Sequence, residues 1–188
     1  MLALLVAACG PPKGITPGTA PTVVVPKALA PRPLAEVFVL EASGAQPEDT
    51  SLNVVSGGPR VVVVRRSAPD YGIFAELHFP GKTLTAPIGA SDARLTISPR
   101  PSQYGMDLSV AGTVGDGATI VFSYGAHFVA PAGARARYGS NLAFEKELAI
   151  GRLEENGQVV FLPTTRAASD VLSAPLAGPG RYLVAAPR

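Results

Sequence analysis

The chain has 188 residues, a length typical of one domain or of one domain with a small appendage. Hydrophobic residues make up 47% and charged residues only 16%, which argues against wholesale disorder. The formal net charge of +2 is too small to indicate a nucleic-acid partner, and the scattered arginines, including Arg65 and Arg66, are predicted to lie on a solvated surface. Because there is one cysteine, no internal disulfide can form and a hydrophobic core must hold the fold.

The first residues have the pattern of an exported protein. Residues 2–8 are an uninterrupted apolar run that ends in small residues, and Cys9 follows directly. The run is far shorter than the ~20 apolar residues of a transmembrane helix and matches the lower limit of a signal-peptide core. Signal peptides open with positive charge, and no Lys or Arg precedes this run, so we expect the natural start to lie upstream of Met1. The alternative is a short apolar tail with a chance cysteine.

The end of this run, Val6-Ala7-Ala8-Cys9, resembles the lipobox of bacterial lipoproteins. The resemblance implies that residues 1–8 are a signal peptide that is removed and that Cys9 receives a diacylglyceryl group. It also implies that the protein is anchored to a membrane of the bacterial cell envelope, the outer membrane if the cell has one. Two or three acyl chains, at ~0.8 kcal/mol per buried CH₂, hold a protein on a bilayer essentially permanently.

Residues 9–33 are rich in proline and glycine and contain no acidic residue. Proline at this spacing precludes a helix and removes backbone donors from a sheet. We therefore predict an extended spacer that lifts the folded domain off the bilayer. The segment 22–25 is β-prone, so an edge strand there is the alternative.

Residues 34–188 are predicted to form one all-β domain. Apolar residues recur with a period of two, and the many glycines and prolines place turns between the runs. The predicted strands lie near 37–40, 52–54, 60–65, 73–79, 94–98, 106–110, 118–124, 148–153, 158–162, 170–174 and 181–185. The run 37–40 is apolar on both sides, which favours a central strand. About ten short strands of this kind predict an antiparallel Ig-like β-sandwich.

Several local features can be predicted within these strands. Ile73, Ala75, Leu77 and Phe79 should face inward, with Glu76 and His78 on the polar face. Inward positions are also expected at Leu95, Ile97, Met106, Leu108, Val110, Ile120, Phe122 and Tyr124. The segment 139–147 is ambiguous and is predicted to hold a helical turn or two after Asn141.

The clearest local signal is a hairpin in the last third of the chain. Asn156-Gly157 lies between two apolar runs, the strongest short-range hairpin signal. We predict that both residues are central in a tight turn and that both have positive φ.

Two parts of the domain resemble known families. Ser56-Gly57-Gly58-Pro59-Arg60-Val61, followed by Phe79-Pro80-Gly81 and Leu95-Thr96-Ile97-Ser98-Pro99, is similar to the opening of ZU5-like domains. The segments 118–124, 148–153 and 181–184, with Asn156-Gly157 between them, resemble the repeated Ig-like modules of bacterial surface proteins. The resemblance spans roughly 51–185 and implies a β-sandwich with an interaction or spacer role and no catalytic residue.

The chemically active side chains form no recognisable constellation. His78 and His127 are far apart, and with Cys9 lipidated no zinc-ligand spacing remains. A Ser-His-Asp triad is formed by residues that meet in space, so the sequence leaves this alternative open, but no Gly-x-Ser-x-Gly elbow occurs. Tyrosines on strands favour packing at the edge of the core over a sugar-stacking platform. Most of the aspartates, which occur singly, are expected in turns: Asp49, Asp70, Asp92, Asp107, Asp116 and Asp170. Four glutamates cluster in the sequence and are expected to be neutralised by Lys146 and Arg152: Glu145, Glu147, Glu154 and Glu155.

We therefore predict that the protein is not an enzyme, with no catalytic residue, metal ligand or cofactor, and with ligand-binding residues left unassigned. The leading hypothesis is a lipid-anchored β-sandwich of the cell envelope with a structural, adhesive or scaffold role and a protein partner in the envelope. The alternative is a binding module for a small ligand or a glycan.

Overall fold

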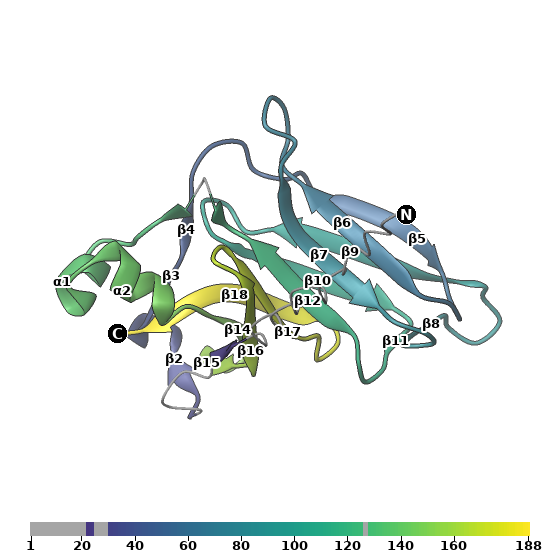
Figure 1. Ribbon diagram of the computed structural model, residues 1–188. Coiled ribbons are helices and arrows are strands. Elements are labelled where there is room, and N and C mark those ends of the chain that lie inside the picture. The colour runs from purple at the N-terminus through teal and green to yellow at the C-terminus, as the bar shows by residue number, and fades with distance from the viewer. Residues whose placement is uncertain (1–21, 25–29, 126–127) are drawn as a thin grey trace, which may run out of the picture.

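The structure of the protein is a computed structural model, which describes residues 22–24, 30–125 and 128–188 (Figure 1). Its strands pair antiparallel, and most belong to two large sheets that share one hydrophobic core. The antiparallel β-sandwich predicted from the period-two pattern is therefore confirmed.

The first sheet has six strands, and β6 is at one edge. Their spatial order is β1 (Thr22–Val24), β16 (Thr164–Ala168), β17 (Val171–Pro175), β12 (Thr119–Ser123), β7 (Ile73–Phe79) and β6 (Arg60–Arg65).

The second sheet has eight strands, and β5 is at one edge. The order is β2 (Arg32–Pro33), β15 (Gln158–Phe161), β14 (Ala149–Leu153), β18 (Gly180–Pro187), β10 (Gly105–Ala111), β9 (Asp92–Pro99) and β5 (Thr50–Val55), and β3 (Val37–Val39) pairs with β18 off this path.

Short elements hold the connections between the sheets. β8 (Leu84–Thr85), in the crossover from β7 to β9, pairs with β11 (Thr113–Val114), in the crossover from β10 to β12. Gly112 has a φ of 141°, and a Cβ there would lie 2.4 Å from the Thr85 carbonyl oxygen, so only glycine fits. β4 (Glu41–Ala42) pairs with β13 (Phe128–Val129). The described helices are η1 (Leu34–Glu36), α1 (Ala134–Tyr138) and α2 (Asn141–Lys146).

The core is filled by large side chains from both sheets and from α2. Leu95, Ile97, Ile120, Phe122 and Tyr124 are fully buried, as predicted from their alternation. A second, smaller cluster, which includes Val37, Leu153, Val159, Phe161 and Leu183, uses the alternate positions of β14 and β18. This second cluster explains why the run 37–40 is apolar on both sides: Val37 contacts it while Phe38 contacts the main core. Within the described residues β3 pairs with β18 alone, so it is not the central strand that was expected.

The predicted inward face of β7 is wrong at the first residue of the strand. Ile73 was expected inside but is 38% exposed, and Phe74 is fully buried instead. The register with β6 shifts between Val64 and Arg65, which is a β-bulge in β7. A bulge adds a residue to one strand and re-aims a side chain, so the alternation beyond it no longer follows the sequence.

Part of the segment predicted as a spacer lies in the sheets. Thr22–Val24 forms β1, an edge strand on β16, which agrees with the alternative interpretation of 22–25. Arg32–Pro33 forms β2 on β15, which places the N-terminal side of the domain two residues before position 34. The lipobox and Cys9 lie outside the described residues.

The predicted hairpin is present, but its turn differs. Gly157 has a φ of 78°, whereas Asn156 is not among the residues with positive φ. The Gly157 N–H donates to Glu154 O at 3.0 Å and the Glu154 N–H donates to Gln158 O at 2.8 Å. This pattern is a three-residue connection that ends in a left-handed glycine. The Asn156 Oδ1 accepts the Gln158 N–H at 3.0 Å, so the asparagine supports the turn through its side chain.

The segment 139–147, which the sequence left ambiguous, contains a helix as predicted, and a second helix precedes it. In α2 the Ser140 Oγ caps the first turn by accepting the Ala143 N–H at 3.1 Å. α1 was not predicted; it lies between Gly133 and Gly139, both left-handed.

Candidate functional site

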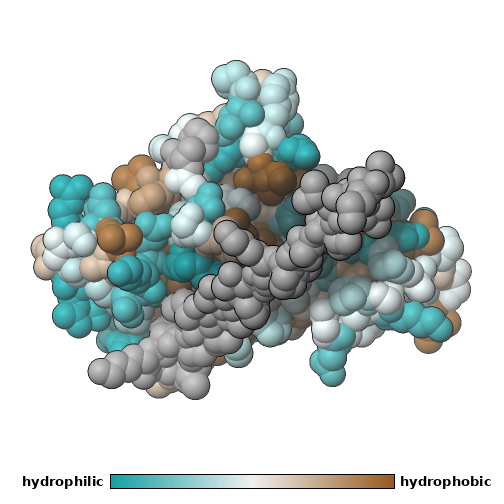
Figure 2. Space-filling view, viewed as in Figure 1, coloured by the Kyte–Doolittle hydropathy of each residue, from teal (hydrophilic) through white to brown (hydrophobic). Residues whose placement is uncertain are grey.

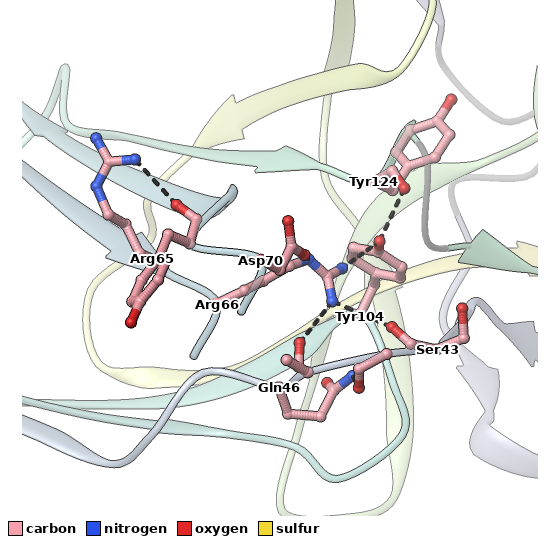
Figure 3. A network of polar contacts seen from close by, with 10 residues as sticks. Ser43, Gln46, Arg65, Arg66, Asp70, Tyr104 and Tyr124 are labelled. Atoms are coloured by element: carbon pink, nitrogen blue, oxygen red, sulfur yellow. Dashed lines mark hydrogen bonds and ion pairs between the residues drawn. The ribbon is translucent and has the colours of Figure 1, made fainter. Parts of the chain in front are cut away.

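The most concentrated polar cluster in the core surrounds Arg66, directly after β6. Arg66 was predicted to be solvated, and that prediction is wrong because its side chain is only 2% exposed. Val62, Val64 and Arg66 occupy alternate positions of one extended run, and the two valines face the groove and core between the sheets. Arg65 points the other way and is exposed, and its Nη1 donates to Tyr71 O at 3.2 Å (Figure 3).

The Arg66 guanidinium is held by several acceptors at once. Its Nη1 donates to Ser43 O at 3.2 Å and to Ala45 O at 2.9 Å. Its Nη2 donates to Tyr104 Oη at 2.5 Å, and its Nε lies 3.5 Å from Asp70 Oδ2 (Figure 3). Since a buried guanidinium is costly unless it is paired and hydrogen-bonded, this set of partners is what permits its burial.

Aromatic rings complete the Arg66 cluster. The rings of Phe74 and Tyr104 stack with centroids 5.3 Å apart, and the guanidinium carbon lies 5.5 Å and 5.3 Å from those two centroids. Tyr104 Oη donates to Tyr124 O at 2.8 Å, which links the residue before β10 to the residue after β12, in the other sheet. Burial raises the pKa of Tyr104 to about 12, although the Arg66 charge opposes this rise. The phenol is therefore a hydrogen-bonding group at neutral pH rather than an acid or base.

A second polar cluster fastens α2 to the first sheet. Tyr124 Oη donates to Glu145 Oε1 at 3.0 Å and also lies 2.9 Å from Ser169 O. The Arg166 guanidinium donates to Tyr124 Oη, and its Nη2 donates to Glu145 O at 2.6 Å. Burial raises the pKa of Tyr124 despite the nearby Arg166. Both clusters thus join segments that are distant in the chain.

A hollow of about 200 Å³ opens beside these two clusters. Asp70, Tyr104, Tyr124 and Asp170 line it. Among the described residues, no three His, Cys, Asp or Glu side chains come close enough to hold a metal ion. The hollow therefore contains the carboxylates of Asp70 and Asp170 next to the Arg66 guanidinium, which is already hydrogen-bonded within the domain.

Larger concavities lie on the surface and are open. One of about 750 Å³ is lined by Asp107, Arg152, Glu154 and Arg181, among others. Arg152 and Glu154 lie 3.6 Å apart in an ion pair, so part of this charge is neutralised, as predicted. Another, of about 490 Å³, runs between the edge strands β5 and β6. In Figure 2, hydrophobic residues reach the surface in several separate places rather than over one continuous face.

Those residues singled out in the sequence that the structure describes are not brought together. His78 lies on the polar face of β7, as predicted, with its Nε2 2.9 Å from Glu76 Oε2; His127, like Cys9, lies outside the described residues. Asp107 pairs with Arg100 at 3.1 Å. Tyr104, Tyr124 and Tyr182 are buried and Tyr71 is exposed, so the tyrosines do not form one stacking platform. No helix among the described residues is long and apolar enough to cross a membrane.

Comparisons with protein-family models, curated proteins and solved structures find no significant match for this chain. The resemblance to ZU5-like and bacterial Ig-like modules, and the resemblance to lipoproteins at Cys9, remain predictions from the sequence.

Proposed function

We propose that this protein is a lipid-anchored component of the bacterial cell envelope whose β-sandwich acts by contact and not by catalysis. Cys9 would carry the lipid, and the proline-rich segment after it would connect the lipid to the domain. The folded domain would then serve a structural, adhesive or scaffold role at the membrane surface, with a protein partner in the envelope.

The observation that carries the contact role is how Arg66 is used. It is the most deeply buried charged side chain of the described part, and its partners are two backbone carbonyls, a tyrosine hydroxyl and Asp70. In an active site, a buried arginine would point toward the substrate and would have N–H groups free to donate hydrogen bonds to it. Here the guanidinium is bound by the domain's own groups, in a sandwich whose interior is filled by aromatic and aliphatic side chains, which favours a rigid module that presents surfaces.

The anchor is tested by Cys9→Ser in cells that express the protein from its natural start. We expect the wild type to incorporate radiolabelled palmitate and to fractionate with membranes, because the acyl chains would supply nearly all of the membrane affinity. The variant should lose both the label and the membrane retention while it keeps the melting temperature of the domain. Thr50→Ser, an exposed change within the domain, is the control and should behave like the wild type.

Label on the Cys9→Ser protein, or its continued retention in the membrane fraction, would overturn the anchor. A catalytic turnover assigned to the purified domain would overturn the contact role separately.

The alternative function, binding of a small polar ligand or glycan, is favoured by one feature. The open concavity that includes Asp107, Arg152, Glu154 and Arg181 offers charged and hydrogen-bonding groups on a shallow surface. Glycan-array binding that is lost in Arg181→Ala would favour this alternative, since Arg181 is exposed and its removal should leave the fold intact.

A further inference from the structure

The outer face of the first sheet carries little charge. The strand registers place Val63, Glu76, Val121, Ser173 and Thr165 in one row across β6, β7, β12, β17 and β16. The neighbours of these residues along each strand point into the core, so this outer row lies on the solvent side of the sheet. None of its members is buried, and Glu76 is its one charged side chain.

Such a face is unusual for an antiparallel sheet in water, which normally presents polar side chains to the solvent. The outer face of the second sheet follows that rule, since it carries Arg94, Asp107 and Arg181. On the first sheet, by contrast, Val63 is 40% exposed and Val61, in the next row, is 55% exposed. Exposed valines on a face with so little charge favour a surface that another segment covers.

The chain enters this sheet at the edge opposite β6. β1 is the edge strand beside β16, and residues 10–21, which lie outside the described residues, lead directly into it. The sequence of this N-terminal segment is Gly-Pro-Pro-Lys-Gly-Ile-Thr-Pro-Gly-Thr-Ala-Pro. Its prolines favour a polyproline II helix, in which every third residue faces the same way. Pro12, Ile15 and Pro21 then share one side, and Lys13, the only charged residue of the segment, lies next to it.

The segment is long enough to cross the whole face. Neighbouring strands are about 4.8 Å apart, so β7, four strands from β1, lies roughly 19 Å away from it. Nine residues lead from Lys13 to Thr22, and at about 3.1 Å per residue they span roughly 28 Å. The surplus of about 9 Å leaves room for the chain to turn from the edge of the sheet onto its outer face.

We propose that the N-terminal segment folds back over the outer face of the first sheet and runs from β1 towards β6 along the outer row. In this arrangement Ile15 contacts Val121 and Pro12 contacts Val63. The two valines lie two strands apart, a separation of roughly 9.6 Å. Three residues of polyproline II advance about 9.3 Å, so the spacing of Pro12 and Ile15 matches that of the valines.

The charges and polar groups of the face suit this segment. Lys13 falls between the two apolar contacts, above β7, where it meets Glu76. The Glu76 side chain is 25% exposed with His78 as its neighbour at 2.9 Å, so a lysine can approach it from the solvent. Polyproline II makes no internal hydrogen bonds, so the carbonyl oxygens of the segment can accept from hydroxyls such as that of Ser173. Arg65, which also points to this side, lies outside the outer row.

The path of the segment sets where the anchor emerges. Cys9 comes four residues before Lys13, so it lies up to about 12 Å further along the same line, beyond β6. If Cys9 carries the lipid, the β6 edge and not the β1 edge faces the bilayer. The crossing goes beyond the proposed anchor and does not depend on it. A segment that does not dock leaves the anchor standing, and an unlipidated Cys9 leaves the crossing standing.

A paramagnetic label on Cys9 tests the crossing. The full chain is expressed without export, so that its only cysteine keeps a free thiol for a nitroxide label, which broadens the amide NMR signals of residues near it. We expect Val61 and Val63 to lose the most signal, Thr165 to lose less, and Arg94 on the other sheet to lose almost none. A segment that extends away from β1 without docking would broaden the signals of β1 and β16 most, and that result would overturn the proposal.

Ile15→Asp and Ala20→Asp form a matched pair of variants outside the folded domain. Ile15→Asp places a charge against the valines, so the β6 signals should recover their intensity. Ala20→Asp places the same charge on a side of the polyproline II helix that does not face the valines, so the broadening should stay unchanged. Equal broadening in Ile15→Asp and in the unsubstituted chain would contradict the crossing.

A charge exchange tests the pairing of Lys13 with Glu76. Lys13→Glu or Glu76→Lys alone should weaken the broadening at β6, and the two together should restore it. Lys27→Glu, the same change at a lysine on the other side of β1, is the control and should have no effect. A double variant that stays undocked would overturn this placement of Lys13. Broadening that disappears on dilution would mean that the segment of a second copy covers the face, and it would overturn the crossing.

Discussion

Arg65 and Arg66 are adjacent in the sequence, yet one is exposed and the other is among the most buried side chains of the described part. We expect Arg66→Met to lower the free energy of unfolding by about 3 kcal/mol, because it removes the buried hydrogen bonds that the guanidinium donates to Tyr104 Oη and to the carbonyl oxygens of Ser43 and Ala45. Urea unfolding followed by circular dichroism measures the change.

Arg65→Met is the matched control for this experiment. The Arg65 side chain is exposed, and within the described part of the chain it makes one hydrogen bond, to Tyr71 O. Its replacement should therefore change the free energy of unfolding by less than about 0.5 kcal/mol. If the two variants were equally stable, the Arg66 cluster would not be a structural element.

Among the elements, the β14–β15 hairpin depends most visibly on one backbone conformation. Gly157 has a φ of 78°, and a Cβ at this position would meet no atom within 4 Å. The cost of Gly157→Val is therefore backbone strain alone, and we expect a loss of about 1 kcal/mol or more. Thermal unfolding measures the loss, and Glu155→Val, at an exposed position of the same turn without positive φ, should cost clearly less. An unchanged melting temperature for Gly157→Val would contradict the turn assignment.

The elements also show how far the sequence alone leads. Strands such as β9 and β12 could be predicted with their inward faces because alternation is a local property. The inward turn of Phe74 could not, because a bulge is set by the register with a neighbouring strand. The sequence holds one weak indication that Arg66 is buried, because Arg66 continues the alternation of Val62 and Val64. Its hydrogen-bond partners, however, come from distant segments of the chain that only the fold brings together.

The candidate site was therefore less predictable than the fold. Strand periodicity identifies which residues face the core, whereas a polar cluster depends on which residues from different strands meet there. The strand at 22–24 was hard to predict for the same reason. Its β-branched residues suit a strand, but the edge of β16 with which it pairs is more than a hundred residues away in the sequence.

At the scale of the whole molecule, buried phenols make the stability of the sandwich sensitive to alkali. Burial raises the pKa of Tyr104 and of Tyr182 from 10.0 to about 12 and also raises the pKa of Tyr124 and Tyr138. Tyr104 donates to Tyr124 O, and Tyr182 donates to Gly178 O at 2.6 Å, so ionisation would remove a donor from each bond. The folded protein thus holds these protons more tightly than the unfolded chain does.

This difference fixes the direction of the pH dependence. Between pH 10 and about 12 the unfolded chain has released protons that the folded protein still binds, so the free energy of unfolding falls as the pH rises. The contribution of these phenols is complete below pH 10 and is lost as the pH rises through about 12. Urea unfolding at a series of pH values, with phenolate absorbance recorded in parallel, should show ionisation and loss of structure together. Tyr104→Phe and Tyr182→Phe, each compared with its own stability at neutral pH, should make the alkaline decline shallower. A wild-type stability that stays level to pH 12, or a decline just as steep in both variants, would show that these phenols are not protected by the core.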